Sequence, residues 1–235
     1  SYQGWKGTLY PEKLSQADYL QYYSRVFNTT EINNTFYRTP STETTTRWAS
    51  QVPSGFRFTL KLSRWITHHK KLTKCDREME EFFRGTEPLW GHLACLLVQL
   101  SPSFQKDLKV LDDFLAKFSS EVPLALEFRH ESWFASEVYR LLEQYGAALV
   151  VVDTDDQEAV RKTTPPFVYV RLRRARYDTQ ELDEWARWMV SLKSDVFAYV
   201  RHHQSSPQVA RNLGAILGSL SSDRESEKSS CRRRP

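Results

Sequence analysis

The 235-residue sequence predicts a single α/β domain whose parallel strands close into a barrel. Strand-like runs alternate with amphipathic helices along the chain, and such alternation implies a parallel sheet. Several of these runs end in ionisable or amide side chains, as in LALEFRH at 124–130 and FVYVRLRR at 167–174. The sequence has no GxGxxG or P-loop motif of an open nucleotide-binding sheet. Together these observations favour a TIM-like (β/α)8 barrel, in which the site is built where many strands end.

The first half of the chain alternates four helices with four strands. Helical spacing covers 14–27, 41–52, 75–90 and 104–119, and strand-like runs cover 29–38, 56–68, 93–100 and 124–130. Ser41 or Thr42 is the expected N-cap of the second helix, because both side chains can accept a hydrogen bond from the first turn. The run at 93–100 reads as apolar throughout, which is typical of a central strand.

The second half continues the pattern. Its expected helices are 136–146, 181–192 and 207–220, and its strands are 147–155, 167–174 and 196–203. Gly146 is expected at the C′ position of its helix, where glycine is favoured. The sequence therefore predicts seven strands, each followed by a helix, which is one strand fewer than a closed (β/α)8 barrel has.

Composition excludes some classes of protein. The formal charge of +4 falls to +1 without Arg232, Arg233 and Arg234, so the charge of the whole chain gives no case for nucleic acid. The three cysteines form no CxxC pair, which favours a reduced cytoplasmic protein. We expect no membrane span, because no apolar stretch approaches ~18 residues, and no signal peptide. The expected barrel domain is 1–220, followed by a disordered Ser/Arg-rich tail at 221–235.

Residue parity predicts where the charged groups point. Side chains two apart on a strand share a face, so Glu127 and Arg129 oppose Leu126 and Phe128. The expected inward set at the carboxyl ends of the strands is Glu31, Asn33, Lys61, Ser63, Glu127, Arg129, Asp153, Arg171, Arg173, Arg201 and His203. Its cations outnumber its acids by two. Because low-dielectric walls focus the field of such a site, we expect it to bind a small anionic ligand.

The same set suggests acid/base chemistry. Glu127 and Glu31 are candidate bases and Lys61 a candidate acid or Schiff-base former, because a carboxylate beside a desolvated lysine can titrate closer to neutrality. The candidate substrate-binding residues are Asn33, His68, Arg129, Asp153, Arg171 and Arg201. A buried ion-pair network without catalysis is the alternative interpretation of the same residues. The enzyme hypothesis therefore stands beside a noncatalytic binding module for nucleic acid or a protein partner.

A divalent metal is a further alternative. Glu31, Glu127, Asp153 and His203 supply suitable ligand types. The sequence has no HxH or HExxH spacing, and neighbouring lysine and arginine would repel a cation, so no cofactor is expected. Trp5, Trp65 and Trp133 lie near the expected mouth, where aromatic rings beside cations would suit a phosphorylated or nucleotide-like ligand.

Motifs spread over residues 2–217 resemble those of the YecE-like family, also called domain of unknown function 72. They are GWKGTLYP at 4–11, EINNTFYR at 31–38, KLSRWITHHKKL at 61–72, LEFRHESW at 126–133, YVRLRR at 169–174 and the pair Trp185 and Ala186. The resemblance implies a TIM-barrel-like fold, and the family's biochemical role is not established.

The resemblance also implies a strand ahead of the 4–11 motif. Ser1 begins inside the turn that would follow that strand, so strand 1 is expected to be missing from this chain. An open barrel exposes two unpaired strand edges, and restoring the upstream residues is therefore expected to raise solubility and melting temperature. The chain also departs from the family pattern in having Arg173 and Arg174 in place of a His-Gly pair. It has Arg201, His202, His203 and Gln204 where other members carry acids.

Overall fold

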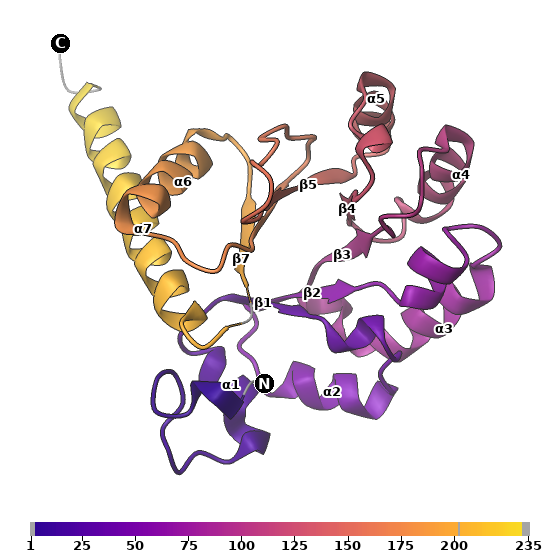
Figure 1. Cartoon of the computed structure of the whole chain (residues 1–235). Helices are drawn as coiled ribbons and strands as arrows, with labels where there is room; N and C mark the ends of the chain where they lie inside the picture. Colours follow the sequence, from indigo (N-terminus) through magenta and orange to yellow (C-terminus); the bar gives the residue numbers. More distant parts are fainter. Residues whose placement is uncertain (1–2, 202, 232–235) are drawn as a thin grey trace.

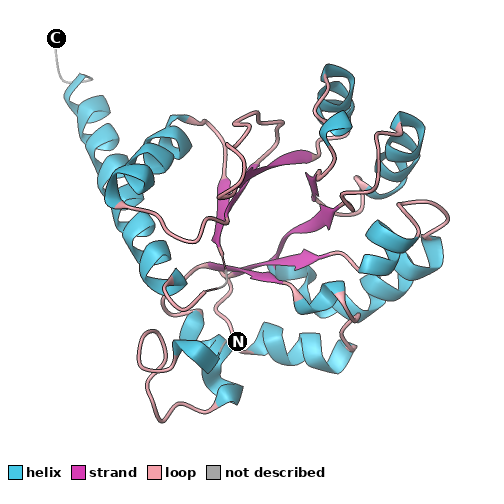
Figure 2. Ribbon diagram, viewed as in Figure 1, coloured by secondary structure: helices cyan, strands magenta, loops and turns pink. Residues whose placement is uncertain are grey.

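Seven parallel strands, hydrogen-bonded in the order of the chain, curve into a nearly closed barrel with the helices outside it (Figures 1 and 2). The computed structural model describes residues 3–201 and 203–231. The strands are β1 (Thr29–Ile32), β2 (Arg57–Lys61), β3 (Leu93–Gln99), β4 (Leu124–Glu127), β5 (Ala148–Asp153), β6 (Val168–Leu172) and β7 (Val196–Val200). This architecture confirms the predicted α/β barrel with one strand fewer than eight.

The α-helices begin and end where local signals place them. They are α1 (Tyr19–Tyr23), α2 (Thr42–Ser50), α3 (Asp76–Thr86), α4 (Leu108–Phe118), α5 (Ser136–Gln144), α6 (Thr179–Ser191) and α7 (Ser206–Cys231). The Ser41 hydroxyl caps α2 by accepting a hydrogen bond from the Thr44 amide. Gly146 follows α5 with a φ of 61°, in the left-handed region that glycine enters without steric cost. A reciprocal capping box between Asp178 and Glu181 begins α6.

The structure differs from the expected alternation between β5 and β6. Residues 154–167 form no helix, so the chain returns to the sheet through a loop that ends at Pro165 and Pro166. Proline removes a backbone donor and disfavours helical backbone in the residue before it, which accounts for the loop at its carboxyl end.

Two expected strands are also shorter than their apolar runs. The chain leaves β1 at Ile32 and forms a 3₁₀ turn over Asn34–Phe36. It leaves β2 at Lys61 and forms a π-helical turn over Trp65–His69. Asn33 and Asn34 favour such a turn, because asparagine side chains bond to nearby backbone. Both turns therefore lie at the carboxyl ends of their strands, which we call the mouth of the barrel.

The helix α7 continues to Cys231, through most of the segment 221–235 that the sequence predicts to be disordered. The segment contains Glu, Arg and Lys, which have good intrinsic helix propensity, and it extends a helix that has already begun. Residues 232–235 of the expected tail lie outside the described part of the chain.

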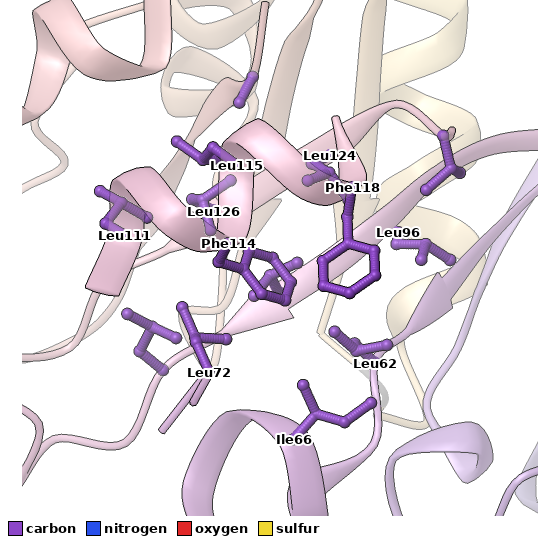
Figure 3. Packing of buried hydrophobic residues seen from close by; sticks show 14 of the residues in the cluster. Leu62, Ile66, Leu72, Leu96, Leu111, Phe114, Leu115, Phe118, Leu124 and Leu126 are labelled. Carbon is purple, nitrogen blue, oxygen red and sulfur yellow. The ribbon is translucent and has the colours of Figure 1, made fainter. Parts of the chain in front are cut away.

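The largest apolar layer lies between the outer face of the sheet and the helices α3, α4 and α5. Figure 3 shows Leu96 of β3 and Leu124 and Leu126 of β4 beside residues of α4, including Phe114 and Phe118. All five side chains are buried. A second layer packs β6 against α6 and α7. These layers fix the outer faces of the strands and thereby decide which residues point inward.

The inside of the barrel has an apolar floor and a polar top. The floor contains small and aromatic residues from five strands and the residue before β6, namely Cys95, Leu97, Ala125, Ala148, Val150, Phe167, Tyr169 and Tyr199. One step further along the strands, toward the mouth, the inward residues are charged or amide side chains. The floor excludes water beneath them, which lowers the local dielectric and strengthens their interactions.

The barrel is open between β1 and β7. These two strands are the edges of the seven-stranded sheet, and no ladder joins them in the described part of the chain. A cavity of about 700 Å³ lies beside them, lined by residues of both strands and of α1 and α7. Most residues of β1 and β7 are only half-buried, whereas nearly all of β4 and β6 are buried. The opening therefore has the position and the edges expected of a missing strand.

Candidate active site at the barrel mouth

Five polar side chains from five different strands meet above the apolar floor. They are Glu31 of β1, Lys61 of β2, Gln99 of β3, Glu127 of β4 and Arg171 of β6. On each of these strands, the residue two positions earlier points inward at the level of the floor. Because side chains two apart on a strand share a face, all five polar side chains lie at the same level. Hydrogen bonds connect them into one network.

Glu127 lies at the centre of this network and is fully buried. Its carboxylate accepts from Arg171 Nη1 at 2.5 Å, from Arg129 Nε at 2.5 Å and from Gln99 Nε2 at 2.9 Å. Burial by itself would raise the pKa of Glu127, but the charges of Arg171 and Arg129 outweigh it and lower the pKa. A carboxylate held in this way is a weak base, so the geometry favours an orienting role over the general-base role that the sequence suggests.

Arg171 joins the two carboxylates of the site. Its Nη2 donates to Glu31 Oε1 at 2.7 Å, while its Nη1 binds Glu127. Burial would lower the pKa of this guanidinium, but the charges of Glu127 and Glu31 raise it instead, so Arg171 stays cationic. The second oxygen of Glu31 accepts from the Tyr169 hydroxyl at 2.7 Å, and Asn33 Nδ2 donates to Oε1 at 2.8 Å. Each of the two carboxylates therefore accepts three hydrogen bonds from donors within the protein.

Lys61 has a different environment. Its Nζ donates to the amide oxygen of Gln99 at 2.9 Å and lies 3.9 Å from the centre of the Phe36 ring. It forms no ion pair with a carboxylate in the described part of the chain. Burial, and then the charge of Arg171, lower the pKa of Lys61 to about 8. At pH 7 the neutral fraction of this amine is therefore on the order of a few hundred times that of an ordinary lysine.

His68 lies on the π-helical turn and contacts the same Phe36 ring as this amine. Its ring meets the edge of Phe36 at a centroid distance of 5.0 Å, and its Nδ1 is 2.9 Å from the Thr67 hydroxyl. Burial, and then the charge of Lys61, lower the pKa of His68, so the imidazole is neutral at pH 7. His68 is therefore a neutral proton acceptor close to a lysine that can donate.

Arg173 completes the positive side of the mouth. It follows β6, lines the cavity at the opening together with Glu31 and Asn33, and forms no ion pair within the described residues. Burial, and then the neighbouring charge of Arg171, lower its pKa. The cations Lys61, Arg129, Arg171 and Arg173 face the acids Glu31 and Glu127, so the formal surplus is two positive charges.

The structure does not bring three of the expected inward residues into this cluster: Asp153, Arg201 and His203, the last being exposed with its Nδ1 3.2 Å from the Ser205 hydroxyl. Asp153 is buried on the outer face of β5, where it accepts from Arg174 Nε at 3.0 Å and from the Tyr177 hydroxyl at 2.9 Å. It points outward because Val150 and Val152 take the inward positions of β5. Arg201 is exposed, and its Nη1 lies 3.8 Å from Asp155.

Three residues of the site were missed by sequence reasoning. Gln99 was hidden in a run that reads as apolar, although it shares parity with the inward Leu97. Tyr169 shares parity with Arg171, and its hydroxyl could have been expected to face Glu31. Phe36 carried no signal in the sequence, because it reaches the Lys61 amine only through the 3₁₀ turn after β1.

The aromatic residues expected at the mouth divide into two groups. Trp133 is buried in the core, stacked on Phe128 at a centroid distance of 4.8 Å. Trp5 packs against Tyr10 and Tyr23 beside the opening of the barrel. Trp65 is exposed on the π-helical turn. Only Trp65 of these three therefore offers a ring to the solvent at the mouth, within the described residues.

In residues 3–201 and 203–231, no three His, Cys, Asp or Glu side chains are grouped so as to hold a metal ion. Of the four metal-ligand candidates, Asp153 lies on the opposite face of the sheet from Glu31 and Glu127. Nor does any helix within these ranges have the length and apolar character needed to cross a membrane.

The fold and the sequence resemble those of proteins without an established function. A DUF72 family protein from Thermotoga maritima superimposes with a TM-score of 0.70 at 28% identity, over 94% of this chain and 96% of that one. One from Enterococcus faecalis V583 gives a TM-score of 0.72 at 20% identity, over 85% of this chain and 88% of that one. The second likeness shows the fold alone.

Curated relatives match part of the chain. The UPF0759 protein YecE of Escherichia coli K12 is 32% identical over 148 residues, which cover 60% of this chain and 54% of YecE. The UPF0759 protein YunF of Bacillus subtilis is 28% identical over 146 residues, which cover 58% of this chain and 52% of YunF. The chain thus spans about half the length of these relatives. The model of the family described as "Protein of unknown function DUF72" matches residues 1–231, and the chain therefore belongs to the DUF72 family.

Proposed function

We propose that the barrel mouth binds a small anionic substrate, phosphorylated or carboxylated, and acts on it by acid/base chemistry in which Lys61 exchanges the proton. The observation that carries this proposal is the environment of the Lys61 amine. It is buried beside arginines and paired with a neutral amide rather than with a carboxylate. A lysine in a purely structural ion pair would have a carboxylate partner and a raised pKa.

The charges of the mouth support an anionic substrate. Glu31 and Glu127 already have several donors each, so they leave little negative charge to attract cations. Arg173 and Lys61 have no carboxylate partner within the described residues, and both lose solvation by burial. A phosphate or carboxylate that binds between them replaces the lost solvation with charge-assisted hydrogen bonds.

The proposed roles follow from the titration of each group. Lys61 donates a proton when it is charged and accepts one when it is neutral, because its pKa of about 8 is close to physiological pH. His68, neutral beside it, relays the proton. Glu127 holds Arg171 and Arg129 in position, and Glu31 holds the other end of the Arg171 guanidinium. Asn33 fixes the orientation of Glu31.

The anion site is tested by calorimetric titration of the whole chain with inorganic phosphate and with pyruvate. We expect Arg173→Met and Lys61→Met to weaken binding at least about tenfold, because each removes a poorly solvated cation. The matched control is Arg201→Met, since Arg201 is a cation near the mouth that is exposed to solvent and lies outside the cluster. Equal losses in the control and in the two site variants would contradict the assignment of the anion to this cluster.

Catalysis is tested by proton exchange. A panel of small phosphorylated and carboxylated carbonyl compounds is incubated with the protein in D₂O, and exchange of the acidic C–H protons is followed by NMR. We expect exchange that is lost in Lys61→Met and slowed in His68→Gln. If anions bind but no member of the panel exchanges, the mouth is a noncatalytic binding module, and titration with oligonucleotides at two salt concentrations then tests the nucleic-acid alternative.

A further inference from the structure

Two large aromatic side chains lie exposed at the turns that follow β1 and β2. Tyr37 is 67% exposed and Trp65 is 55% exposed. Both lie at the carboxyl ends of their strands, on the same side of the barrel as the polar cluster. Burying such rings is strongly favourable, so a pair left in solvent beside a basic site is a feature that a ligand would explain.

Ring contacts connect Tyr37 directly with the charged cluster. The Lys61 amine lies 3.9 Å from the centre of the Phe36 ring, and Phe36 meets Tyr37 edge to face at 5.1 Å. Phe36 also holds the His68 ring at 5.0 Å. A ligand with its anionic group at Lys61 therefore has an aromatic surface beginning next to that group and leading outward to Tyr37.

Trp65 lies on the π-helical turn that also carries His68. Its indole packs on the His69 ring at a centroid distance of 4.4 Å and an interplanar angle of 31°, which fixes its orientation while more than half of it stays exposed. A ring held in place before binding loses little entropy when a second ring stacks on it. Trp65 is thus a preorganised stacking surface on the same turn as a residue of the cluster.

We propose that the mouth binds a nucleoside phosphate, with its phosphate among Lys61, Arg129 and Arg173 and its base stacked on the exposed rim formed by Tyr37 and Trp65. This inference rests on the proposed function and names the substrate class of the same site. A flat aromatic base covers the exposed rings by stacking on them. A phosphate or a small carboxylate alone would leave these rings in solvent. Stacking on an aromatic side chain is sequence-tolerant, because every base has a π face.

The proposal is tested with three probes that differ by one chemical part each. Inorganic phosphate, ribose 5-phosphate and AMP are titrated calorimetrically into the whole chain. We expect AMP to bind at least about tenfold more tightly than ribose 5-phosphate, because stacking adds to the phosphate contact. Quenching of tryptophan fluorescence by AMP, and not by ribose 5-phosphate, is the accompanying signal.

Substitutions of the two rim residues test whether the base stacks on the rim. Trp65→Ala and Tyr37→Ala are expected to reduce the affinity for AMP about tenfold and to leave that for ribose 5-phosphate unchanged. The matched control is Trp90→Ala. Trp90 is 42% exposed, but it lies on the turn Glu87–His92 that precedes β3, at the opposite end of the barrel. AMP should bind to this variant as it does to the unchanged protein.

The possible failures are distinguishable. If AMP and ribose 5-phosphate bind equally and both are lost in Arg173→Met, the nucleotide class is overturned and the anion site stands. If AMP binding survives Arg173→Met and Lys61→Met, both the nucleotide assignment and the proposed anion site are overturned. If Trp90→Ala loses AMP binding while circular dichroism shows that it keeps its fold, the assignment of the base to the rim is also contradicted.

Discussion

The hydroxyl groups of Tyr199 and Thr29 lie 2.8 Å apart and join β7 to β1, the two edge strands between which no backbone ladder forms. The Tyr199 hydroxyl is also 2.8 Å from the Thr59 hydroxyl of β2. These contacts are at the level of the apolar floor, where the side chain of Tyr199 is almost entirely buried. The Tyr199 side chain therefore bridges the two edge strands directly inside the barrel.

Tyr199→Phe is expected to lower the free energy of unfolding by about 1–3 kcal/mol, because it removes one hydrogen bond from each of the Thr29 and Thr59 hydroxyls and leaves them the Arg57 carbonyl and the Cys95 sulfur. Urea unfolding followed by circular dichroism measures the change. Tyr37→Phe is the control, since Tyr37 is exposed and should lose less than about 0.5 kcal/mol. Equal effects of the two substitutions would show that the Tyr199 hydroxyl does not hold the opening.

An added strand is expected to fill the opening between β1 and β7. Val168 and Arg201 donate the hydrogen bonds that join β6 to β7, which leaves the backbone groups of Val196, Ala198 and Val200 facing the gap. Trp5 Nε1 donates to the carbonyl of His203 at 2.8 Å, so the N-terminal segment lies at the mouth end of β7, where a parallel strand in the gap would end.

A β-forming extension of about six residues ahead of Ser1 is therefore expected to raise the melting temperature by several degrees, because it pairs two free edges. Differential scanning calorimetry measures the shift. An extension of the same length made of Gly and Ser is the control, since it has no apolar side chains to bury. Equal melting temperatures for the two extended proteins would contradict the prediction.

Breaking the Arg171 network is expected to be costly. Arg171→Met leaves Glu31 and Glu127 buried without their shared cation and should lower the free energy of unfolding by about 3–5 kcal/mol. Chemical denaturation checks this value. The control is Arg187→Met, which breaks an exposed pair with Asp183 and should cost less than about 1 kcal/mol. Adding Glu127→Gln to Arg171→Met should recover part of the loss, and a further additive loss would contradict the coupling.

The depressed pKa of Lys61 predicts how stability depends on pH. Between about pH 8, its value in the folded state, and 10.5, its ordinary value, the unfolded chain binds more protons at this residue than the folded protein does. The Lys61 contribution to the free energy of unfolding therefore rises as pH increases through this window. In Lys61→Met that rise is absent, so the stability of the variant relative to the unchanged protein should fall between pH 8 and 10.5.

Trace acetylation followed by peptide mass spectrometry measures the titration of Lys61 directly. Its apparent pKa should be close to 8. Lys109 provides an internal control, because its hydrogen bond with Asp113 raises its pKa above the ordinary value. Identical titration of the two lysines would contradict the desolvated environment of Lys61.

Part of the site follows from the sequence by itself. Strands with one charged and one apolar face fix their own orientation, so parity places Glu31, Lys61, Glu127 and Arg171 inside the barrel, where the structure has them. The strand β5 gives no such signal. Its run AALVVVD is apolar on both faces, so nothing in it distinguishes an inward from an outward Asp153.

The sequence determined a parallel barrel of seven strands and the level at which its inward charges gather, because both depend on local periodicity. Only the tertiary structure decided which side chains each of these charged groups contacts. Lys61 meets the neutral Gln99 and the Phe36 ring, while Glu127 receives Arg171 and Arg129. These choices depend on distances between strands that are far apart in the chain. The result is an amine with a pKa lowered toward neutrality, as the sequence suggested, beside a carboxylate whose pKa is lowered by two arginines that the sequence did not assign to it.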